Sequence, residues 1–277
     1  MAVYNVEGHE PSILPDGKEW KLVWHDEFDG SELDKTKWGF RTGFWGRRFK
    51  TYTTDEAIEM RGDSCIRLHL IERDGHYYSA QLQTGGNCFD NPREDCDRAN
   101  CGGKNFWPLG RIEEPKFMHR YGYYECRCKL QSQPGWWSAF WLQSPNIGTT
   151  YYPETSGVEV DIMENFTRDG LITSGNLTLG YGVQGKREGR VKYHIDNPTD
   201  FHRYGVHWSP EGYVFYCDGK ETSRANKYVS HVEQFVLLTT ECYGYRMGNM
   251  DTPCDELKTA VLPDCFTVDY VRVFDEV

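Results

Sequence analysis

Short apolar runs separated by turn residues make up most of this chain. The runs are rich in Val, Ile, Tyr, Phe and Trp, and Gly, Pro, Asn and Asp stand between them. No long stretch repeats its apolar residues with the 3.6-residue period of an amphipathic helix. Asp218-Gly219, which follows the run 213–217, is a hairpin signal, and the 28 glycines fit a chain with many turns. The pattern predicts an all-β fold and, at this length, a large β-sandwich.

Residues 157–166 break this pattern, because three carboxylates stand in a run that otherwise predicts a buried strand. The run reads Gly-Val-Glu-Val-Asp-Ile-Met-Glu-Asn-Phe, and its acids are Glu159, Asp161 and Glu164. Val, Ile and Met favour a buried strand, whereas acids are costly to bury without a reason. Conflicts between local pattern and chemistry tend to mark functional sites.

Side-chain alternation places Glu159 and Asp161 on one face of this strand and Glu164 on the other. One extra residue, a β-bulge, would bring all three acids onto one face. The two glutamates would then lie about 13 Å apart along the strand. Side chains leaning together would bring their carboxylates to about 5 or 6 Å, the separation expected for retaining glycoside hydrolysis, whereas inversion needs a wider gap for water. Asp161 would hold a proton or hydrogen bond between them and keep the glutamates in different protonation states.

An acidic strand has two other interpretations, a calcium site and a solvated sheet edge. Calcium ligands usually come from loops with Asp, Asn and Gly spacing. Here the neighbours of the acids are Val158, Val160, Ile162 and Met163, which would back onto a core. The catalytic interpretation is therefore favoured.

Further motifs, in a fixed order around the acids, resemble glycoside hydrolase family 16. The resemblance is to the bulged Glu-x-Asp-x-x-Glu branch of that family, which includes laminarinases, agarases, porphyranases and κ-carrageenases. It runs from about residue 20 to residue 273, and its Trp-x-Ala-x-Trp motif is found at residues 137–141. The other matching segments are residues 22–30, 110–112, 121–129, 201–208, 216–220 and 268–273.

The resemblance implies a concanavalin A-like jelly roll whose concave sheet forms the substrate cleft. It also implies that Glu159 is the nucleophile, Glu164 the general acid/base and Asp161 the helper of a retaining double displacement. The geometric interpretation assigns the same roles. No cofactor is expected for catalysis.

Many members of the family hold one structural calcium. The matching positions here are Glu27, the carbonyl of Gly62, and Asp269. Oxygen ligands from chain ends and a turn are chemically suitable for calcium. Three unrelated surface groups are the alternative.

Trp137 and Trp141 share one face of the strand before the acids, because they lie four residues apart. Aromatic faces are apolar platforms for sugar rings, so both are predicted to line the substrate cleft, with core packing as the alternative. For Trp208, a position lining the sheet and a position packed in the core are equally expected.

The segment 44–53 aligns with a laminarinase loop that usually reads Trp-Gly-Asn-Asn-Glu. It keeps Trp45 but has Arg47 and Arg48 in place of polar residues, and paired arginines suit sulfate or carboxylate through forked charged hydrogen bonds. A solvated basic turn is the alternative. Asn176 stands where the family often has His; it can hydrogen-bond a sugar or the nucleophile but cannot titrate. Arg246, in a Gly-rich loop, is a further substrate-binding candidate.

These residues predict an endo-acting glycoside hydrolase that cleaves a β-linked polysaccharide with retention. The arginine pair slightly favours an algal-type β-galactan, sulfated or not, such as agar, porphyran or carrageenan. An endo-β-1,3- or mixed-linkage glucanase, laminarinase-like, is the alternative. A transglycosylase would use the same residues. A non-catalytic carbohydrate-binding module is less expected, because degenerate members should lose at least one acid and this chain keeps all three.

Composition and charge limit the partners. With 31 basic and 42 acidic residues, the net charge of −11 disfavours nucleic acid, which requires a basic surface. No run of 18 apolar residues predicts a membrane span. We expect one catalytic domain over residues 1–277 and a monomer. Because a polymer cannot enter a cell, a secreted or periplasmic enzyme whose signal peptide has been removed is predicted.

Ten cysteines are many for a cytosolic enzyme but too few to dictate a disulfide scaffold. Cys126 and Cys128 share one face of a predicted strand and are interpreted as small buried thiols. Disulfides are expected within two loop regions, and a zinc site, which no CxxC or His spacing supports, is the alternative. The cysteines concerned are Cys88, Cys96 and Cys101 in a polar loop and Cys242, Cys254 and Cys265 near the C-terminal end.

Overall fold

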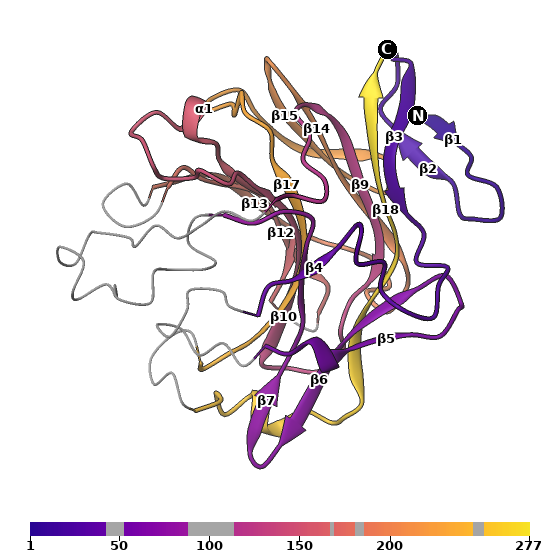
Figure 1. Cartoon of the computed structure of the whole chain (residues 1–277), viewed down its shortest axis with the longest axis vertical. Coiled ribbons are helices and arrows are strands. Elements are labelled where there is room, and N and C mark those ends of the chain that lie inside the picture. The colour runs from indigo at the N-terminus through magenta and orange to yellow at the C-terminus, as the bar shows by residue number, and fades with distance from the viewer. Residues whose placement is uncertain (43–52, 88–113, 167–168, 181–185, 246–251) are drawn as a thin grey trace.

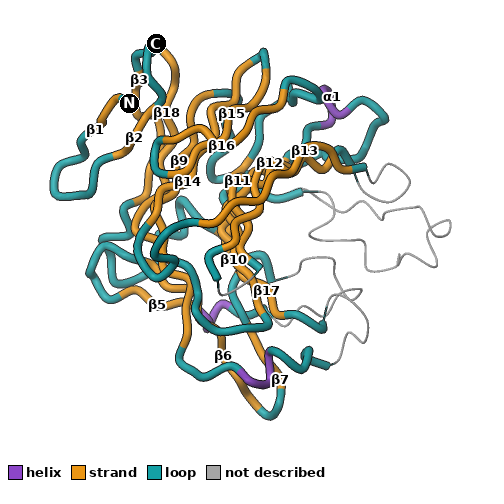
Figure 2. The backbone as a smooth tube through the Cα atoms, turned by 180° about the vertical axis from the view of Figure 1, so that it is seen from behind, coloured by secondary structure: helices purple, strands orange, loops and turns teal. Residues whose placement is uncertain are grey.

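The computed structural model describes residues 1–42, 53–87, 114–166, 169–180, 186–245 and 252–277. Within them, the strands form a seven-stranded sheet, a nine-stranded sheet and a separate two-stranded ribbon. Figures 1 and 2 show the two large sheets facing each other. The largest cluster of buried apolar side chains takes residues from both sheets, so the core lies between them. The predicted all-β sandwich is confirmed.

The seven-stranded sheet contains the acid-bearing strand, β11, and the tryptophan-bearing strand, β10, which is central. β10 pairs with β11 on one side and with β17 on the other, both antiparallel, so residues far apart in the sequence meet on this sheet. In spatial order the strands are β13 (Arg187–His194), β12 (Leu171–Thr178), β11 (Glu159–Asn165), β10 (Trp136–Gln143), β17 (Phe235–Cys242), β8 (Gln81–Gln83) and β4 (Gly39–Phe40).

The nine-stranded sheet covers the other side of the core. Its main path is β16 (Lys220–Ala225), β15 (Gly212–Cys217), β14 (His202–Ser209), β9 (Gly122–Lys129), β18 (Asp264–Glu276), β6 (Ile66–Arg73) and β5 (Ile58–Met60). Off this path, β3 (Trp20–Asp26) pairs with β18 and β7 (His76–Tyr78) pairs with β6. The ribbon is β1 (Ala2–Tyr4) with β2 (Ser12–Leu14).

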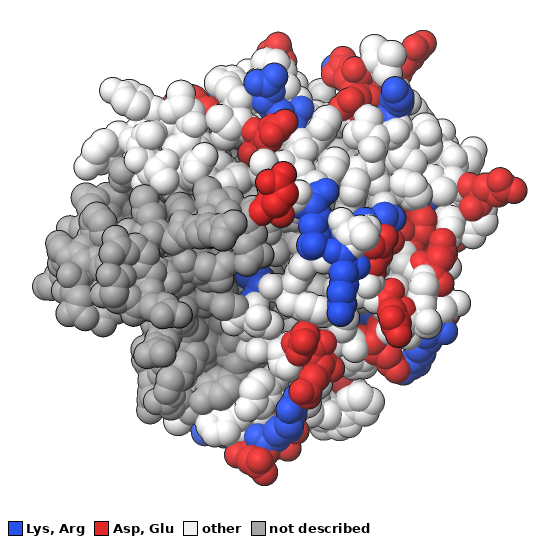
Figure 3. Space-filling model, viewed as in Figure 1, with Lys and Arg blue, Asp and Glu red and all other residues white. Residues whose placement is uncertain are grey.

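Helix is scarce in the described part of the chain. It comprises α1 (Pro153–Ser156) and two 3-10 turns, Asp55–Ala57 and Leu257–Thr259. None of these helices is long and apolar enough to cross a membrane. On the face shown in Figure 3, acidic and basic side chains are interspersed.

Strand alternation explains which side chains form the core. On β9, Tyr124, Cys126 and Cys128 point into it, and on β10, Phe140 and Leu142 do. The remaining residues of these strands point to the opposite sides of their sheets. The two cysteines are fully buried free thiols, as predicted.

The hairpin predicted at Asp218-Gly219 is confirmed. These two residues connect β15 to β16 with φ values of 47° and 76°. Positive φ at both central residues is what a two-residue hairpin turn requires. Trp208, on β14, is fully buried and its indole nitrogen donates to the carbonyl of Ser230 at 3.1 Å, so the core interpretation is correct for this residue.

The disulfides expected near the C-terminal end are wrong. Cys242, Cys254 and Cys265 all carry free thiols. Cys265 belongs to β18 in the sheet opposite Cys242, which ends β17. Cys254 packs against the same small apolar cluster as Cys242, yet both of these thiols are free. The cysteines of the polar loop, at positions 88, 96 and 101, lie outside the described residues.

Candidate active site

A β-bulge interrupts the pairing of β11 with β10. Phe140 pairs with Met163 and the next residue, Trp141, pairs with Asp161, so Ile162 has no partner on β10. Both Ile162 and Met163 belong to the core cluster. Two consecutive core-facing residues reverse the alternation of the strand, as the sequence predicted.

All three acids of β11 consequently face one cavity. Glu159 and Glu164 are half-buried in it, and Asp161 is buried. Side chains from β10, β12, β13 and β17 complete the wall. The other lining residues are Trp137, Ala139, Trp141, Phe166, Asn176, Arg187, Arg190, Thr239, Glu241 and Tyr243.

Amide side chains hold two of the acids in place. The amide nitrogen of Gln143 donates to Oε2 of Glu159 at 2.9 Å, and Gln143 in turn accepts a hydrogen bond from Asn87. The amide nitrogen of Asn176 donates to Oδ2 of Asp161. Asn176 therefore lines the cavity, where its partner is the central aspartate rather than the nucleophile. Its contact with a sugar stays a prediction.

The crowding of carboxylates raises the pKa of two of them. Burial, followed by the charge of Glu159, raises the pKa of Glu164 to about 7, although Arg187 and Arg190 act in the opposite direction. Burial, followed by the charges of Glu164 and Glu159, raises the pKa of Asp161 well above its usual range. Neighbouring negative charges disfavour one another, so these two carboxyl groups hold their protons to higher pH than exposed acids do.

Aromatic side chains form one wall of the cavity. The ring of Trp137 lies 4.7 Å from that of Tyr243 and 5.7 Å from that of Phe166, measured between centroids. The indole nitrogen of Trp141 donates to Oγ1 of Thr239 at 2.9 Å. Both tryptophans thus lie beside the acids, and their contact with a sugar stays a prediction.

Comparison with known protein families identifies the chain. The model of glycosyl hydrolases family 16 matches residues 104–241, which include β11, its two neighbours β10 and β12, and all of β17 except its last residue. The chain belongs to glycosyl hydrolase family 16. This confirms the resemblance found in the sequence, and it makes the chain a glycoside hydrolase.

Relatives of this family 16 chain are named for different glycans. It is 28% identical to a β-glucanase of Rhodothermus marinus over 92% of the chain and 85% of the relative. It is 26% identical to a keratan-sulfate endo-1,4-β-galactosidase of Sphingobacterium multivorum over 92% of the chain and 55% of the relative. Glucan endo-1,3-β-glucosidase A1 of Niallia circulans is 23% identical over 92% of the chain, which spans only 38% of that protein.

Solved structures give the same fold for the family 16 chain. The laminarinase from Rhodothermus marinus superposes with a TM-score of 0.67 at 21% identity, over 94% of this chain and 99% of that chain. At this identity the likeness establishes the fold, and the predicted jelly roll is confirmed.

Four predicted substrate-binding residues lie outside the described residues. They are Trp45, Arg47 and Arg48 in the segment 43–52 and Arg246 in the segment 246–251. Their roles stay predictions.

The cavity also contains polar residues that the sequence analysis missed. Thr239 and Glu241 stand two residues apart in the apolar run of β17, so their side chains point to the same face of the strand. Two polar side chains on one face of an otherwise apolar strand are a signal that could have indicated a site there. Arg187 and Arg190 of β13 carried no such signal, because residues three apart on a regular strand point to opposite faces.

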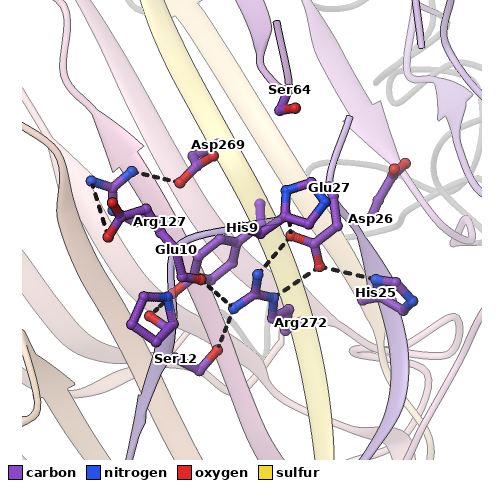
Figure 4. A network of polar contacts seen from close by, with 12 residues as sticks. His9, Glu10, Ser12, His25, Asp26, Glu27, Ser64, Arg127, Asp269 and Arg272 are labelled. Carbon is purple, nitrogen blue, oxygen red and sulfur yellow. Dashed lines mark hydrogen bonds and ion pairs between the residues drawn. The ribbon is translucent and has the colours of Figure 1, made fainter. Parts of the chain in front are cut away.

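Two of the three positions predicted for calcium, Glu27 and Asp269, are engaged in a polar network (Figure 4). Glu27 accepts from Nε and Nη2 of the buried Arg272 at 2.9 and 2.7 Å. Asp269 accepts from Nη1 of Arg127 at 2.5 Å. Among the described residues, no group of three or more His, Cys, Asp or Glu side chains is arranged to hold a metal ion. As arranged here, both carboxylates are matched to arginines rather than to a metal, and calcium stays a prediction.

Proposed function

We propose that this family 16 chain is an endo-acting enzyme that hydrolyses a β-linked polysaccharide with retention, through Glu159 and Glu164. The observation that carries the proposal is the bulge in β11, because it turns both glutamates and Asp161 toward one cavity. In the first step an ionised Glu159 attacks the anomeric carbon while Glu164 gives its proton to the leaving oxygen. In the second step Glu164 takes a proton from water, and the activated water releases the sugar from Glu159.

The charges of the cavity support this order of proton transfers. With a pKa of about 7, Glu164 keeps a proton to donate at neutral pH. The charge of Glu159 is one cause of that raised pKa. When Glu159 becomes a sugar ester, the charge is lost, the pKa of Glu164 falls, and Glu164 becomes a base. Burial and the neighbouring glutamates also raise the pKa of Asp161, which favours its protonated form, and in that form it adds no further negative charge beside the nucleophile.

For the substrate, we favour an algal-type β-galactan, with sulfated galactans included. This preference came from Arg47 and Arg48, and the relative named for keratan sulfate agrees with an anionic galactan. A β-1,3- or mixed-linkage glucan is the second candidate, because two relatives are named as glucanases or glucosidases. A polymeric substrate of either kind implies action outside the cytoplasm, and we expect a secreted or periplasmic monomer.

The first experiment is a substrate screen with one matched variant. The wild type is incubated with laminarin, agarose, porphyran and κ-carrageenan, and released oligosaccharides are measured. Glu159→Gln, which keeps the size and shape of the side chain but replaces one carboxylate oxygen by an amide nitrogen and cannot attack, should lower kcat on the cleaved polymer on the order of 10³-fold or more. Because the fold and the cleft are unchanged, its binding of that polymer should remain. Unchanged turnover in Glu159→Gln would contradict the assignment.

Azide then separates the two glutamates by stereochemistry. In Glu159→Ala, azide replaces the missing nucleophile and should give a glycosyl azide of inverted configuration, after one displacement. In Glu164→Ala, azide should instead attack the glycosyl-enzyme, and two displacements give a glycosyl azide of retained configuration. Nuclear magnetic resonance of the products distinguishes the two. Products of the same configuration from both variants would contradict the proposed roles.

A further inference from the structure

Two arginines of β13 reach the catalytic cavity from one strand, although their spacing is wrong for a regular strand. Arg187 and Arg190 both line the cavity that contains Glu159, Asp161 and Glu164. Side chains three residues apart on a regular strand point to opposite faces. Some irregularity of β13 must therefore turn one of them.

That irregularity is visible in the backbone between them. Gly189 has a φ of 74° and Arg190 a φ of 85°. Glycine is required at position 189, because a Cβ there would collide with the carbonyl oxygen of Gly175 on β12. A long side chain at positive φ is strained by about 1–3 kcal/mol, and such strain collects at functional sites. The chain tolerates this strain at the residue that it directs into the cavity.

Both guanidinium groups are available to a ligand. Within the part of the chain that the structure describes, neither makes a hydrogen bond or an ion pair, and both residues are exposed. Several other arginines among the described residues are engaged by carboxylates, as Arg272 is by Glu27 and Arg127 is by Asp269. The cavity pair therefore presents unused forked donors.

The two arginines lie in a cavity whose wall is otherwise rich in acidic side chains. The cavity wall holds four acids, Glu159, Asp161, Glu164 and Glu241, and the whole chain carries a net charge of −11. Even when Asp161 and Glu164 hold protons, the negative charge of the ionised nucleophile Glu159 remains in the wall. An anionic polymer would be repelled by such a wall unless local cations offset it. A neutral polymer is not repelled by the wall and needs no such offset.

We propose that Arg187 and Arg190 form a subsite for an anionic substituent, a sulfate ester or a carboxylate, on a sugar bound beside the cleaved bond. Planar guanidinium groups bind both kinds of anion through paired charged hydrogen bonds, with defined geometry. The subsite selects the substrate and rests on the proposed catalysis at Glu159 and Glu164. It does not depend on the arginines of the segment 43–52.

Binding to the inactive variant tests the subsite without requiring turnover. Glu159→Gln is titrated calorimetrically with agarose and laminarin oligosaccharides, each in three forms: neutral, O-sulfated and oxidised to the carboxylate at C6. We expect, on at least one backbone, that the sulfated or the oxidised form binds at least about tenfold more tightly than the neutral form, as charge-assisted hydrogen bonds allow. The two anionic forms show which anion the subsite takes.

Arginine variants made in the Glu159→Gln background locate the preference. Arg187→Gln and Arg190→Gln should each remove most of the preference for the anionic form, because they weaken binding of the anionic form much more than binding of the neutral form. Lys192→Gln is the matched control, because Lys192 is an exposed cation on the same strand that does not line this cavity. It should keep the preference.

Three results would overturn the subsite. The first is that no anionic form binds more tightly than its neutral counterpart, which includes the case that none binds. The second is that both arginine variants keep the preference. The third is that Lys192→Gln loses as much of it as they do.

Hydrolysis by the wild type separates this outcome from the fate of the proposed function. Arginine-dependent binding without cleavage of any polymer would leave the subsite standing and reject the catalytic proposal. Cleavage of neutral polymers alone, with no preference for the anionic form in binding, would support the catalytic proposal and reject the subsite. If the arginines serve only to tune Glu164, their variants will shift the pH profile of hydrolysis and leave the anionic preference intact, which also overturns the subsite.

Discussion

The pKa of Glu164 depends on burial and on the charges of single neighbouring residues. Burial is the largest cause of its raised pKa of about 7, the charge of Glu159 comes next, and Glu241 of β17 adds a smaller contribution of the same sign. Glu164 must be protonated to donate, so the kcat/KM of the wild type should fall as the pH rises through about 7. Glu241→Gln removes one negative charge and lowers the pKa of Glu164. The fall should therefore move to lower pH, as a pH–rate profile on the cleaved polymer will measure.

A second glutamate provides the matched control for this prediction. Glu233 is exposed just before β17 and does not line the cavity. Glu233→Gln makes the same change of charge away from Glu164, and its profile should coincide with that of the wild type. If the two variants shifted the profile equally, the effect would come from net charge and not from the cavity.

Residues whose position follows from local alternation could be predicted from the sequence. Glu159 and Asp161 share one face of β11, Trp137 and Trp141 share one face of β10, and all four side chains line the cavity. The partner of Asn176 could not be predicted, because it depends on the register between β11 and β12. A single sequence leaves that register open, since it is fixed by packing over the whole sheet.

Among the strands, the contact between β9 and β18 depends on a glycine. Gly122 opens β9 with a φ of 97°, and a Cβ there would collide with the carbonyl oxygen of Phe274 on β18. Gly122→Ala should lower the free energy of unfolding by the left-handed strain of about 1–2 kcal/mol, and by a further amount, on the order of 1–3 kcal/mol, for displacing β18. Thermal unfolding measures the sum.

Gly75 separates the two contributions. It also has a left-handed φ, of 77°, but an added Cβ would meet nothing within 4 Å. Gly75→Ala therefore carries the strain alone, and its Tm should fall less than that of Gly122→Ala. Equal decreases in Tm for the two variants would mean that β18 is displaced by the extra methyl group without a cost in free energy.

Elements with a local signal were predictable, and those set by distant pairing were not. The hairpin at Asp218-Gly219 and the bulge near Ile162 both follow from residues within a few positions. The neighbour of β10 on its other side is β17, about a hundred residues later, and it brings Glu241 opposite Trp137. Nothing in either segment alone indicates that pairing. The polar residues of β17 could therefore show that Glu241 shares a face with Thr239, but not that this face lies beside the acids of β11.

At the scale of the whole molecule, one buried ion pair joins the two ends of the chain. Arg272 near the C-terminus is fully buried, and besides Glu27 it contacts the carbonyl of Glu10 at 2.8 Å and Oγ of Ser12 at 3.0 Å. The N-terminal segment, the end of β3 and β18 thus meet at one guanidinium (Figure 4). Removing one partner of such a pair leaves a buried charge and is strongly destabilising.

This network is also where the predicted calcium would act, and metal removal tests it. Calcium that binds the folded chain through Glu27, the carbonyl of Gly62 and Asp269 stabilises it by mass action, by about 2.7 kcal/mol at a hundredfold excess over Kd. The Tm of the wild type should therefore rise with added Ca²⁺ and return to its lower value with EDTA.

The quantity to compare between variants is the calcium-dependent increment, which is the rise in Tm between EDTA and added Ca²⁺, and not the absolute Tm. Glu27→Gln is expected to lower the Tm in any buffer, because Arg272 loses its charged partner. If calcium binds here, the variant should also lose the increment, whereas Glu32→Gln, an exposed neighbour, should keep it. An identical wild-type Tm in Ca²⁺ and in EDTA would show that the arginines alone satisfy these carboxylates, and the calcium prediction would then be wrong for this member of the family.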